Sequence, residues 1–163
     1  MKAKSRVLGI DPGLARMGWA MVEQASGRTK LIGCGCLETA SHQPDGDRLL
    51  ALYRQLGKII SRYRPNQVAV EKLYFTTNVS TAMTVGQARG MVLLSAADHR
   101  LPVTEFTPTG VKQSVTGDGR ADKRQVQRMI KILLHLNRLP RHDDTSDAIA
   151  IALCGVVTNN YLV

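Results

Sequence analysis

The amino-acid sequence predicts an α/β fold in which one five-stranded mixed sheet is flanked by helices. Short apolar runs, which are typical of buried strands, alternate with segments of helical periodicity along most of the chain. The first three runs follow one another closely, which favours antiparallel pairing. With 163 residues, 44% of them hydrophobic and 21% charged, the chain suits one globular domain with its own core. We therefore expect a single domain over residues 1–163.

The first three strands are expected near the N-terminus. Residues 7–10 form an apolar run that the turn sequence Asp11-Pro12-Gly13 ends, which predicts a buried central strand. Two further strands are expected at residues 18–22 and 29–37, with a turn at residues 25–28 between them. This spacing predicts an antiparallel meander.

Helices and strands alternate in the rest of the chain. After a polar loop at residues 41–47, whose Asp47 is expected to cap a helix, apolar residues recur every three or four positions up to Tyr63, and Pro65 ends the pattern. The elements expected next are a strand at 67–70, a helix at 79–97, a strand at 101–106, a short helix at 108–115, and helices at 121–134 and 143–157. This order is that of the ribonuclease H-like fold.

The chain is strongly basic. Lys and Arg outnumber Asp and Glu by 22 to 13, which gives a formal net charge of +9. A basic protein gains free energy by displacing counterions from phosphates, so we expect a nucleic acid partner rather than a membrane surface or another acidic partner. No apolar run approaches the roughly 18 residues of a membrane span, and Asp11 interrupts the N-terminal apolar run too early for a signal peptide. We expect a cytoplasmic protein without a membrane segment.

The three cysteines give no metal-binding pattern. Cys34-Gly35-Cys36 lacks the two-residue spacer of a redox or zinc-knuckle pair, and no histidine cluster accompanies it in the sequence. Together with Cys154, these residues are expected to be reduced, buried thiols.

Two carboxylates follow apolar strands. Asp11 ends the first predicted strand and Glu71 ends the fourth. In an open α/β sheet, ligands bind at the carboxyl ends of the strands. If these strands are parallel neighbours, Asp11 and Glu71 lie about 5 Å apart, the spacing of adjacent strands. Two anions at that distance repel each other unless a cation lies between them.

Further carboxylates stand at the start of the last predicted helix. Asp144 and Asp147 are three residues apart and therefore project from one face. Asp143, four residues before Asp147, lies on that face too, so the pattern alone leaves Asp143 and Asp144 as alternatives. Carboxylates at a helix N-terminus are also favoured by capping and by the helix dipole. Asp147 begins the apolar part of the helix and is expected to be half-buried, which is costly for a carboxylate that binds no cation.

The chemistry of this group predicts a magnesium site. The candidate ligands are oxygen atoms, with at most one imidazole nearby, that of His142, and this set suits Mg²⁺ or Mn²⁺ rather than zinc. Carboxylates contributed by two strands and a helix match the needs of two-metal phosphoryl transfer. In that reaction one ion activates water and the other stabilises the leaving oxygen.

Six stretches of the sequence, in order, resemble the RuvC family of Holliday junction resolvases, and the resemblance covers almost the whole chain. A match to the first stretch, Gly-Ile-Asp-Pro-Gly, would be weak evidence on its own, because actin-like ATPases begin with a similar sequence. The stretches are Gly9–Gly13, Val70-Glu71 with the aromatic-containing loop behind it, Gly86–Gly90, Val111–Gln113 followed by Gly117, Ala121–Gln127, and Asp144–Ala152.

The resemblance implies a homodimeric, metal-dependent endodeoxyribonuclease that resolves four-way DNA junctions by paired nicks in strands of like polarity. Its four acidic catalytic positions correspond to Asp11, Glu71, Asp144 and Asp147, which selects Asp144 over Asp143. It implies about two Mg²⁺ ions per site and a RuvA–RuvB-type branch-migration complex as partner. One position departs from the family pattern, because Lys72 follows Glu71 where the family usually has Gln. Neighbours on a strand point to opposite faces, so we expect Lys72 to face solvent or DNA.

The resemblance and the composition also indicate DNA contacts. Tyr74 and Phe75 form an aromatic pair in a polar loop, where they could stack on unpaired bases or hold the loop to the protein body. Tyr74 corresponds to the family's junction wedge. Lys112 and Lys123 correspond to basic positions that the family uses at its active cleft. Arg120 and Arg124 flank Lys123 and could bind DNA phosphates with it. Alternatively, each Arg simply belongs to a solvent-exposed charged face.

Small residues recur along the helix predicted at 79–97. Ala82, Gly86 and Gly90 are spaced by four and would let this helix approach a neighbour closely. That neighbour is either the protein's own sheet or the same helix of a second subunit, and the resemblance favours the second subunit.

Two other functions fit the sequence less well. An RNA-processing nuclease of the same fold would not need the Tyr74 loop or a two-fold partner. A non-catalytic binding module has no reason to keep Asp11, Glu71 and Asp147 at three separated, partly buried positions, and an actin-like fragment would need a second half-domain.

Overall fold

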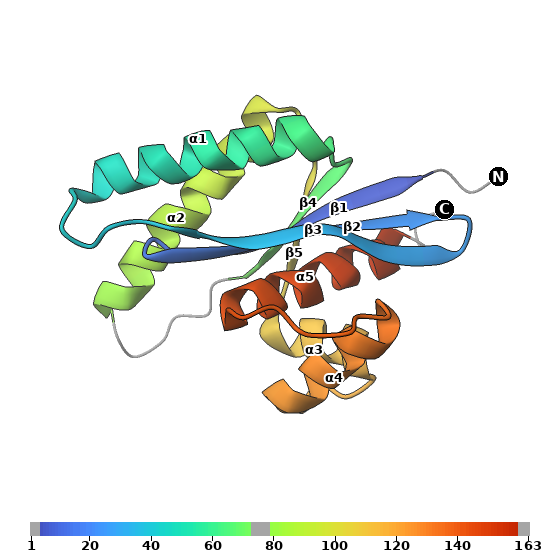
Figure 1. Cartoon of the computed structure of the whole chain (residues 1–163). Helices are drawn as coiled ribbons and strands as arrows, with labels where there is room; N and C mark the ends of the chain where they lie inside the picture. The colour runs from blue at the N-terminus through green and yellow to red at the C-terminus, as the bar shows by residue number, and fades with distance from the viewer. Residues whose placement is uncertain (1–3, 73–78, 160–163) are drawn as a thin grey trace.

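The sheet of the computed structural model contains five strands in the order β3-β2-β1-β4-β5 (Figure 1). The structure describes residues 4–72 and 79–159, without the side chains of 79–81 and 159. The strands are β1 (Ser5–Asp11), β2 (Arg16–Ala25), β3 (Arg28–Glu38), β4 (Gln67–Glu71) and β5 (Val103–Phe106). β1, β2 and β3 pair antiparallel, which confirms the meander, whereas β4 pairs parallel with both β1 and β5.

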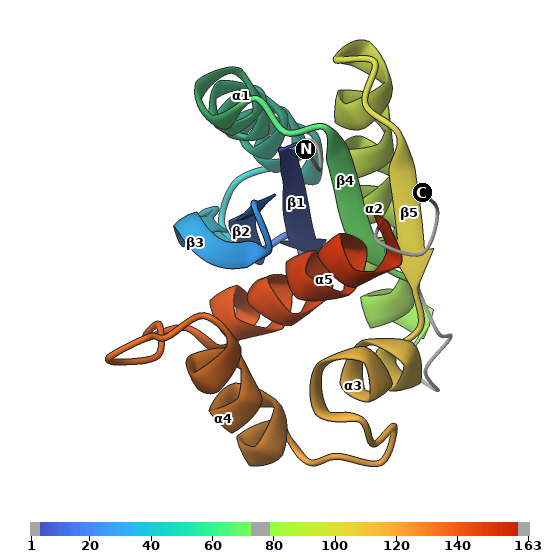
Figure 2. The same cartoon turned by 90° about the vertical axis from the view of Figure 1, so that its right-hand side faces the viewer.

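Helices cover both faces of this sheet. In Figures 1 and 2, α1 and α2 lie on one side, and α5, with α3 and α4 beyond it, lies on the other. The helices are α1 (Asp45–Tyr63), α2 (Val79–Asp98), α3 (Pro108–Thr116), α4 (Lys123–Leu133) and α5 (Asp143–Asn159). The element order is the predicted one. No helix in the described part of the chain is long and apolar enough to cross a membrane.

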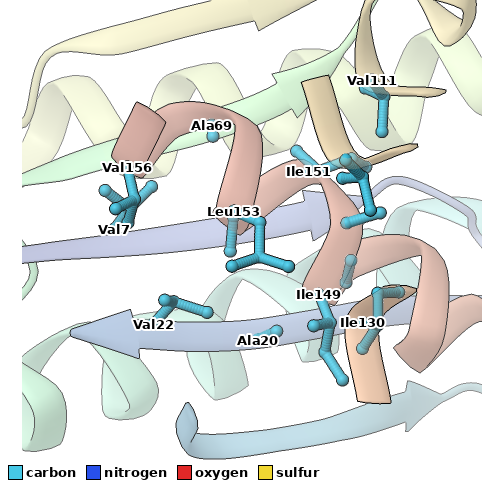
Figure 3. Packing of buried hydrophobic residues seen from close by; sticks show 14 of the residues in the cluster. Val7, Ala20, Val22, Ala69, Val111, Ile130, Ile149, Ile151, Leu153 and Val156 are labelled. Carbon is cyan, nitrogen blue, oxygen red and sulfur yellow. The ribbon is translucent and has the colours of Figure 1, made fainter. Parts of the chain in front are cut away.

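The sheet separates two hydrophobic clusters. Side chains alternate along β1, so Val7 packs against α5 while Leu8 and Ile10 pack on the α1 and α2 side. Figure 3 shows the α5 cluster, in which Ile149, Leu153 and Val156 of α5 meet strand residues such as Val22. This alternation has a consequence for function, because it places Asp11 on the α5 face.

Several boundaries differ from the sequence prediction. Asp47 does not cap α1, because the helix begins two residues earlier at Asp45, after Pro44, and no side chain caps it. Pro44, whose φ is −56°, suits the position before a helix, and both acids lie in the first turn, where the dipole favours them. β5 begins at Val103 rather than 101 because the Leu101 amide instead donates to the Ala96 carbonyl.

The ends of other strands and helices differ from the prediction by a few residues. β2 extends beyond 18–22 to Arg16–Ala25 because it pairs along its length with both neighbours, and Ser26 and Gly27, both with positive φ, form the turn into β3. α4 starts at Lys123 because Asp122 is its N-cap, in a capping box with Gln125.

Helix α5 approaches the sheet closely at glycines. A Cβ atom on Gly9 would overlap the backbone of Ala148 and Ala152, and one on Gly18 would overlap the backbone carbonyl of Asp144. Gly18 pairs with Asp11 across β1 and β2. The start of α5 can therefore rest directly on the strands beside Asp11.

We expect Gly9→Ala to destabilise the protein, because its Cβ would meet backbone atoms of α5 that cannot move aside independently. Overpacking of this kind costs about 1–3 kcal/mol. Urea denaturation followed by circular dichroism measures the loss. Gly46→Ala is the control, since Gly46 is exposed and a Cβ there meets nothing within 4 Å. Equal stability of the two variants would refute the close contact.

Candidate active site

Asp11 and Glu71 lie at the ends of adjacent parallel strands. β1 ends at Asp11 and β4 at Glu71, and the preceding residues, Ile10 and Val70, are paired in the sheet. Glu71 is two residues after Ala69, which belongs to the cluster under α5. Both carboxylates therefore lie on the α5 face, at the carboxyl edge of the sheet, as the sequence predicted.

The first two turns of α5 bring Asp144 and Asp147 to the same edge. The helix begins at Asp143, and the glycine contact at Gly18 holds the Asp144 backbone against β2. Asp147 is half-buried, as expected. The Asp144 carboxylate lies 3.4 Å from Nε of Arg16, an ion pair that no sequence signal indicated, because Arg16 is 128 positions away in the chain.

Three of the four carboxylates line one pocket with a volume of about 240 Å³. Two lysines from α3 and α4 share its wall. The lining residues are Asp11, Glu71, Asp147, Lys112, Lys123, Pro108, Val111, Val126, Ala150 and Ile151. The pocket lining therefore combines anionic, cationic and apolar side chains.

Burial and mutual repulsion disturb the ionisation of these carboxylates. Burial is the main cause that raises the pKa of Asp11 from 3.8 to about 7, and the charges of Asp147, Glu71 and Asp144 add to it. Burial also raises the pKa values of Glu71 and Asp147. Lys112 partly offsets the shift at Glu71, and Lys123 does so at Asp147.

The donor set fits a hard divalent cation. All four carboxylates offer oxygen. Oδ2 of Asp144 accepts no hydrogen bond, and its ion pair with the Arg16 guanidinium, at 3.4 Å, is long. In the described ranges, no three of the four bring oxygen atoms within 4.8 Å of one another. Carboxylates repel one another, and a cation between them would draw them together.

The two neighbouring acids at the start of α5, Asp143 and Asp144, have different surroundings. Nζ of Lys123 lies 3.2 Å from Asp143 and 3.4 Å from Asp147. The Asp143 side chain is 69% exposed and that of Asp144 26% exposed. Asp144, unlike Asp143, is close enough to Asp11 to contribute to its raised pKa. Asp144 is therefore the more buried of the two acids and the one that acts on Asp11, although it is the one carboxylate of the four that does not line the pocket.

The predicted DNA-contacting residues occupy different positions. Lys112 and Lys123 line the pocket, whereas Arg120 and Arg124 are exposed beside it without lining it. Tyr74 and Phe75 lie outside the described residues. Lys72 is exposed, as expected.

The prediction for the cysteines was only partly right. Cys154 is buried, and the half-buried Cys34 packs against the α5 cluster. Cys36 differs, because folding brings Glu38 and His142 to its side. His142 is 106 residues away in the sequence, so no local pattern could have indicated this arrangement.

Comparison with known proteins agrees with this geometry. The family model described as "Crossover junction endodeoxyribonuclease RuvC" matches residues 7–155. This chain belongs to the RuvC family. A RuvC of Chloroflexus aggregans is 52% identical over 153 residues, covering 94% of this chain and 93% of the relative. A RuvC of Roseiflexus sp. is 49% identical over 150 residues, covering 92% and 89%.

A solved structure supports the same assignment. That of T. thermophilus RuvC in complex with a Holliday junction substrate superposes with a TM-score of 0.91 at 32% identity, covering 96% of each chain. The expected ribonuclease H-like fold is thus confirmed. RuvC proteins are metal-dependent endodeoxyribonucleases, so the chain is a nuclease that hydrolyses DNA phosphodiester bonds.

We expect Asp11→Asn to stabilise the metal-free protein at neutral and alkaline pH. The folded-state pKa near 7 lies above the ordinary 3.8, so the folded protein retains a proton that the unfolded chain loses as pH rises from 4 to 7. Above pH 7 the Asp11 carboxylate is ionised in the folded protein and lowers its stability. Below pH 4 it is protonated in both states and has no such effect. Melting temperatures in a chelating buffer should differ by about 3 °C or more at pH 8, since about 1 kcal/mol shifts a domain of this size by 2–4 °C. The difference should vanish near pH 4; a constant difference would contradict the assignment.

Proposed function

We propose that this RuvC-family endonuclease resolves four-way DNA junctions with Asp11, Glu71, Asp144 and Asp147 as its catalytic, metal-binding residues. The observation that carries the proposal is their convergence from β1, β4 and α5 on one sheet edge. The related T. thermophilus RuvC is known in complex with a Holliday junction as its substrate. Junction resolution by paired nicks in strands of like polarity is the corresponding activity here, in recombination and repair.

We further propose Mg²⁺, with Mn²⁺ as a substitute, as the metal and two ions per site. The support is chemical, since hard oxygen ligands select such cations. When bound, the metal would supply Lewis-acid activation of water and stabilise the leaving oxygen. The protein's own contribution is to hold the four carboxylates in place, and to bring Lys112 and Lys123 beside the phosphate that is cleaved.

The remaining DNA contacts follow from charge and from the family resemblance. Arg120 and Arg124 are exposed next to the pocket, where they can bind phosphates of the junction arms. Tyr74 is proposed as the residue that stacks at the crossover and Phe75 as its neighbour in that contact; both rest on sequence alone. A RuvA–RuvB-type complex is the expected protein partner, also by resemblance.

Cleavage of three substrates tests the activity. With Mg²⁺ present, a four-way junction should be nicked in preference to a linear duplex or an RNA–DNA hybrid. Asp11→Asn should lower the cleavage rate by a factor on the order of 10² or more, while junction affinity changes little, because the substitution removes a metal ligand and no DNA contact.

The control for that variant is Asp98→Asn. Asp98 ends α2 on the opposite side of the sheet and accepts a hydrogen bond from the Tyr53 hydroxyl, which an Asn oxygen can also accept. It should cleave like the wild type. Preference for the hybrid would reject junction resolution, and full activity of Asp11→Asn would reject the catalytic assignment.

We also propose that the protein is a homodimer through α2. The stripe predicted at Ala82, Gly86 and Gly90 is only partly exposed, since the first two residues are half-buried. The face turned to solvent instead carries Met83 and Leu94, which are 68% and 63% exposed. Met83, Leu94 and the exposed residues Gln87 and Gly90 recur every three or four positions, so they form one stripe along the helix. A second copy of this stripe would cover both apolar side chains, and paired nicks require two active sites.

Leu94→Glu should shift the protein to the monomer, because a charge would be buried in the proposed interface. Size-exclusion chromatography with light scattering gives the mass. The matched control is Leu50→Glu, which changes an exposed leucine on α1 and should leave the mass unchanged. A dimer that survives Leu94→Glu places the interface elsewhere.

A further inference from the structure

A second group of potential metal ligands lies at the sheet edge formed by β3. One ligand atom from each of Cys36, Glu38 and His142 lies within 4.8 Å of the other two. Cys36 and Glu38 are two residues apart on β3 and so share a face. Cys34, two residues earlier, packs against the α5 cluster, so this is the face that α5 covers.

His142 is held in place by the start of α5. Its carbonyl oxygen accepts hydrogen bonds from the amides of Thr145 (3.2 Å) and Ser146 (3.4 Å). The imidazole therefore belongs to a residue whose backbone is fixed, and β3 fixes the other two. The three donor types are thus supplied by backbone positions that β3 and the start of α5 hold, so only side-chain movement is needed to bring the ligand atoms together.

This group adjoins the carboxylate cluster without belonging to it. Cys36 is paired with Gly18 on β2, and Gly18 is paired with Asp11 on β1, so the three stand in one row across the sheet. Asp144 rests over Gly18, between the two ends of that row. Neither Cys36 nor His142 lines the pocket of Asp11 and Glu71.

We propose that Cys36, Glu38 and His142 bind a thiophilic divalent cation, specifically Zn²⁺. A thiolate, an imidazole and a carboxylate are the ligands that Zn²⁺ takes in proteins, with water in the fourth position. Because zinc–ligand bonds are about 2.0–2.3 Å long, the three ligand atoms must come about 1 Å closer to one another to bind the ion. Glu38 and His142 are exposed and can make that movement. Coordination releases the thiol proton to solvent.

The charges around Cys36 favour a cation. The carboxylates of Glu38 and Asp144 lie close enough to the Cys36 thiol to act on it electrostatically, and so does the guanidinium of Arg16. Arg16 is the competing positive charge; its side chain is 56% exposed and can turn to solvent. A bound cation would also tie β3 to the residue that precedes α5, so it should stabilise the folded protein.

Cd²⁺ and Zn²⁺ titrations of the whole protein test the site. Cd²⁺ bound to a thiolate gives an ultraviolet charge-transfer band, which the oxygen-only cluster cannot produce. The wild type should show the band, and Asp11→Asn should keep it. Cys36→Ser should lose it, and His142→Ala and Glu38→Gln should weaken Zn²⁺ binding at least about tenfold, measured by competition with a chromophoric indicator.

Cys34→Ser is the matched control, because it changes a thiol on the same strand and face whose side chain packs in the core. It should keep the band and the Zn²⁺ affinity. Zn²⁺ should raise the melting temperature of the wild type and of Cys34→Ser by clearly more than that of Cys36→Ser, in which only the carboxylate cluster can still bind the ion. Absence of the band in the wild type, its persistence in Cys36→Ser, or its loss in Cys34→Ser would each overturn the proposal. Junction cleavage enters none of these measurements.

Discussion

The seating of α5 on the sheet is the contact on which the rest of the structure depends. Gly9 and Gly18 leave no side chain between the strands and the helix backbone, so α5 lies against β1 and β2 at backbone distance. Two consequences follow. The α5 side of the hydrophobic core is built around this helix, and its N-terminal turns are delivered to the edge where β1 and β4 end. The α5 side of the core and the position of the carboxylate cluster thus depend on the same helix.

The carboxylate cluster is a local cost to the folded state. Asp11 is half-buried near three other acids, and nearby lysines only partly offset the repulsion. Hydrophobic contacts elsewhere along α5 hold the helix in place despite that repulsion. Active sites commonly combine such locally unfavourable groups with a rigid surrounding structure, because the same charges that repel one another bind the metal.

Much of this arrangement follows from the sequence, because its signals are local. Apolar runs ended by Asp11 and Glu71 mark strand ends, and the three-residue spacing of Asp144 and Asp147 marks one helix face. Contacts between side chains of distant segments could not be predicted from the sequence. Arg16 beside Asp144 and His142 beside Cys36 arise only when β2 and β3 meet the start of α5. The helix start at Asp45 was also missed, since Pro44 rather than a polar cap precedes it.

The origin of the site in the first strand and the last helix also affects its timing during synthesis. Asp11 leaves the ribosome early, whereas Asp147 follows 136 residues later. The sheet needs β4 and β5, and the cluster needs α5 packed on the sheet, so a partly translated chain can have strands but not the assembled carboxylate cluster. Contacts of such long sequence separation also cost more loop-closure entropy and slow folding. The carboxylate cluster of this nuclease can therefore form only when nearly all of its chain has been made.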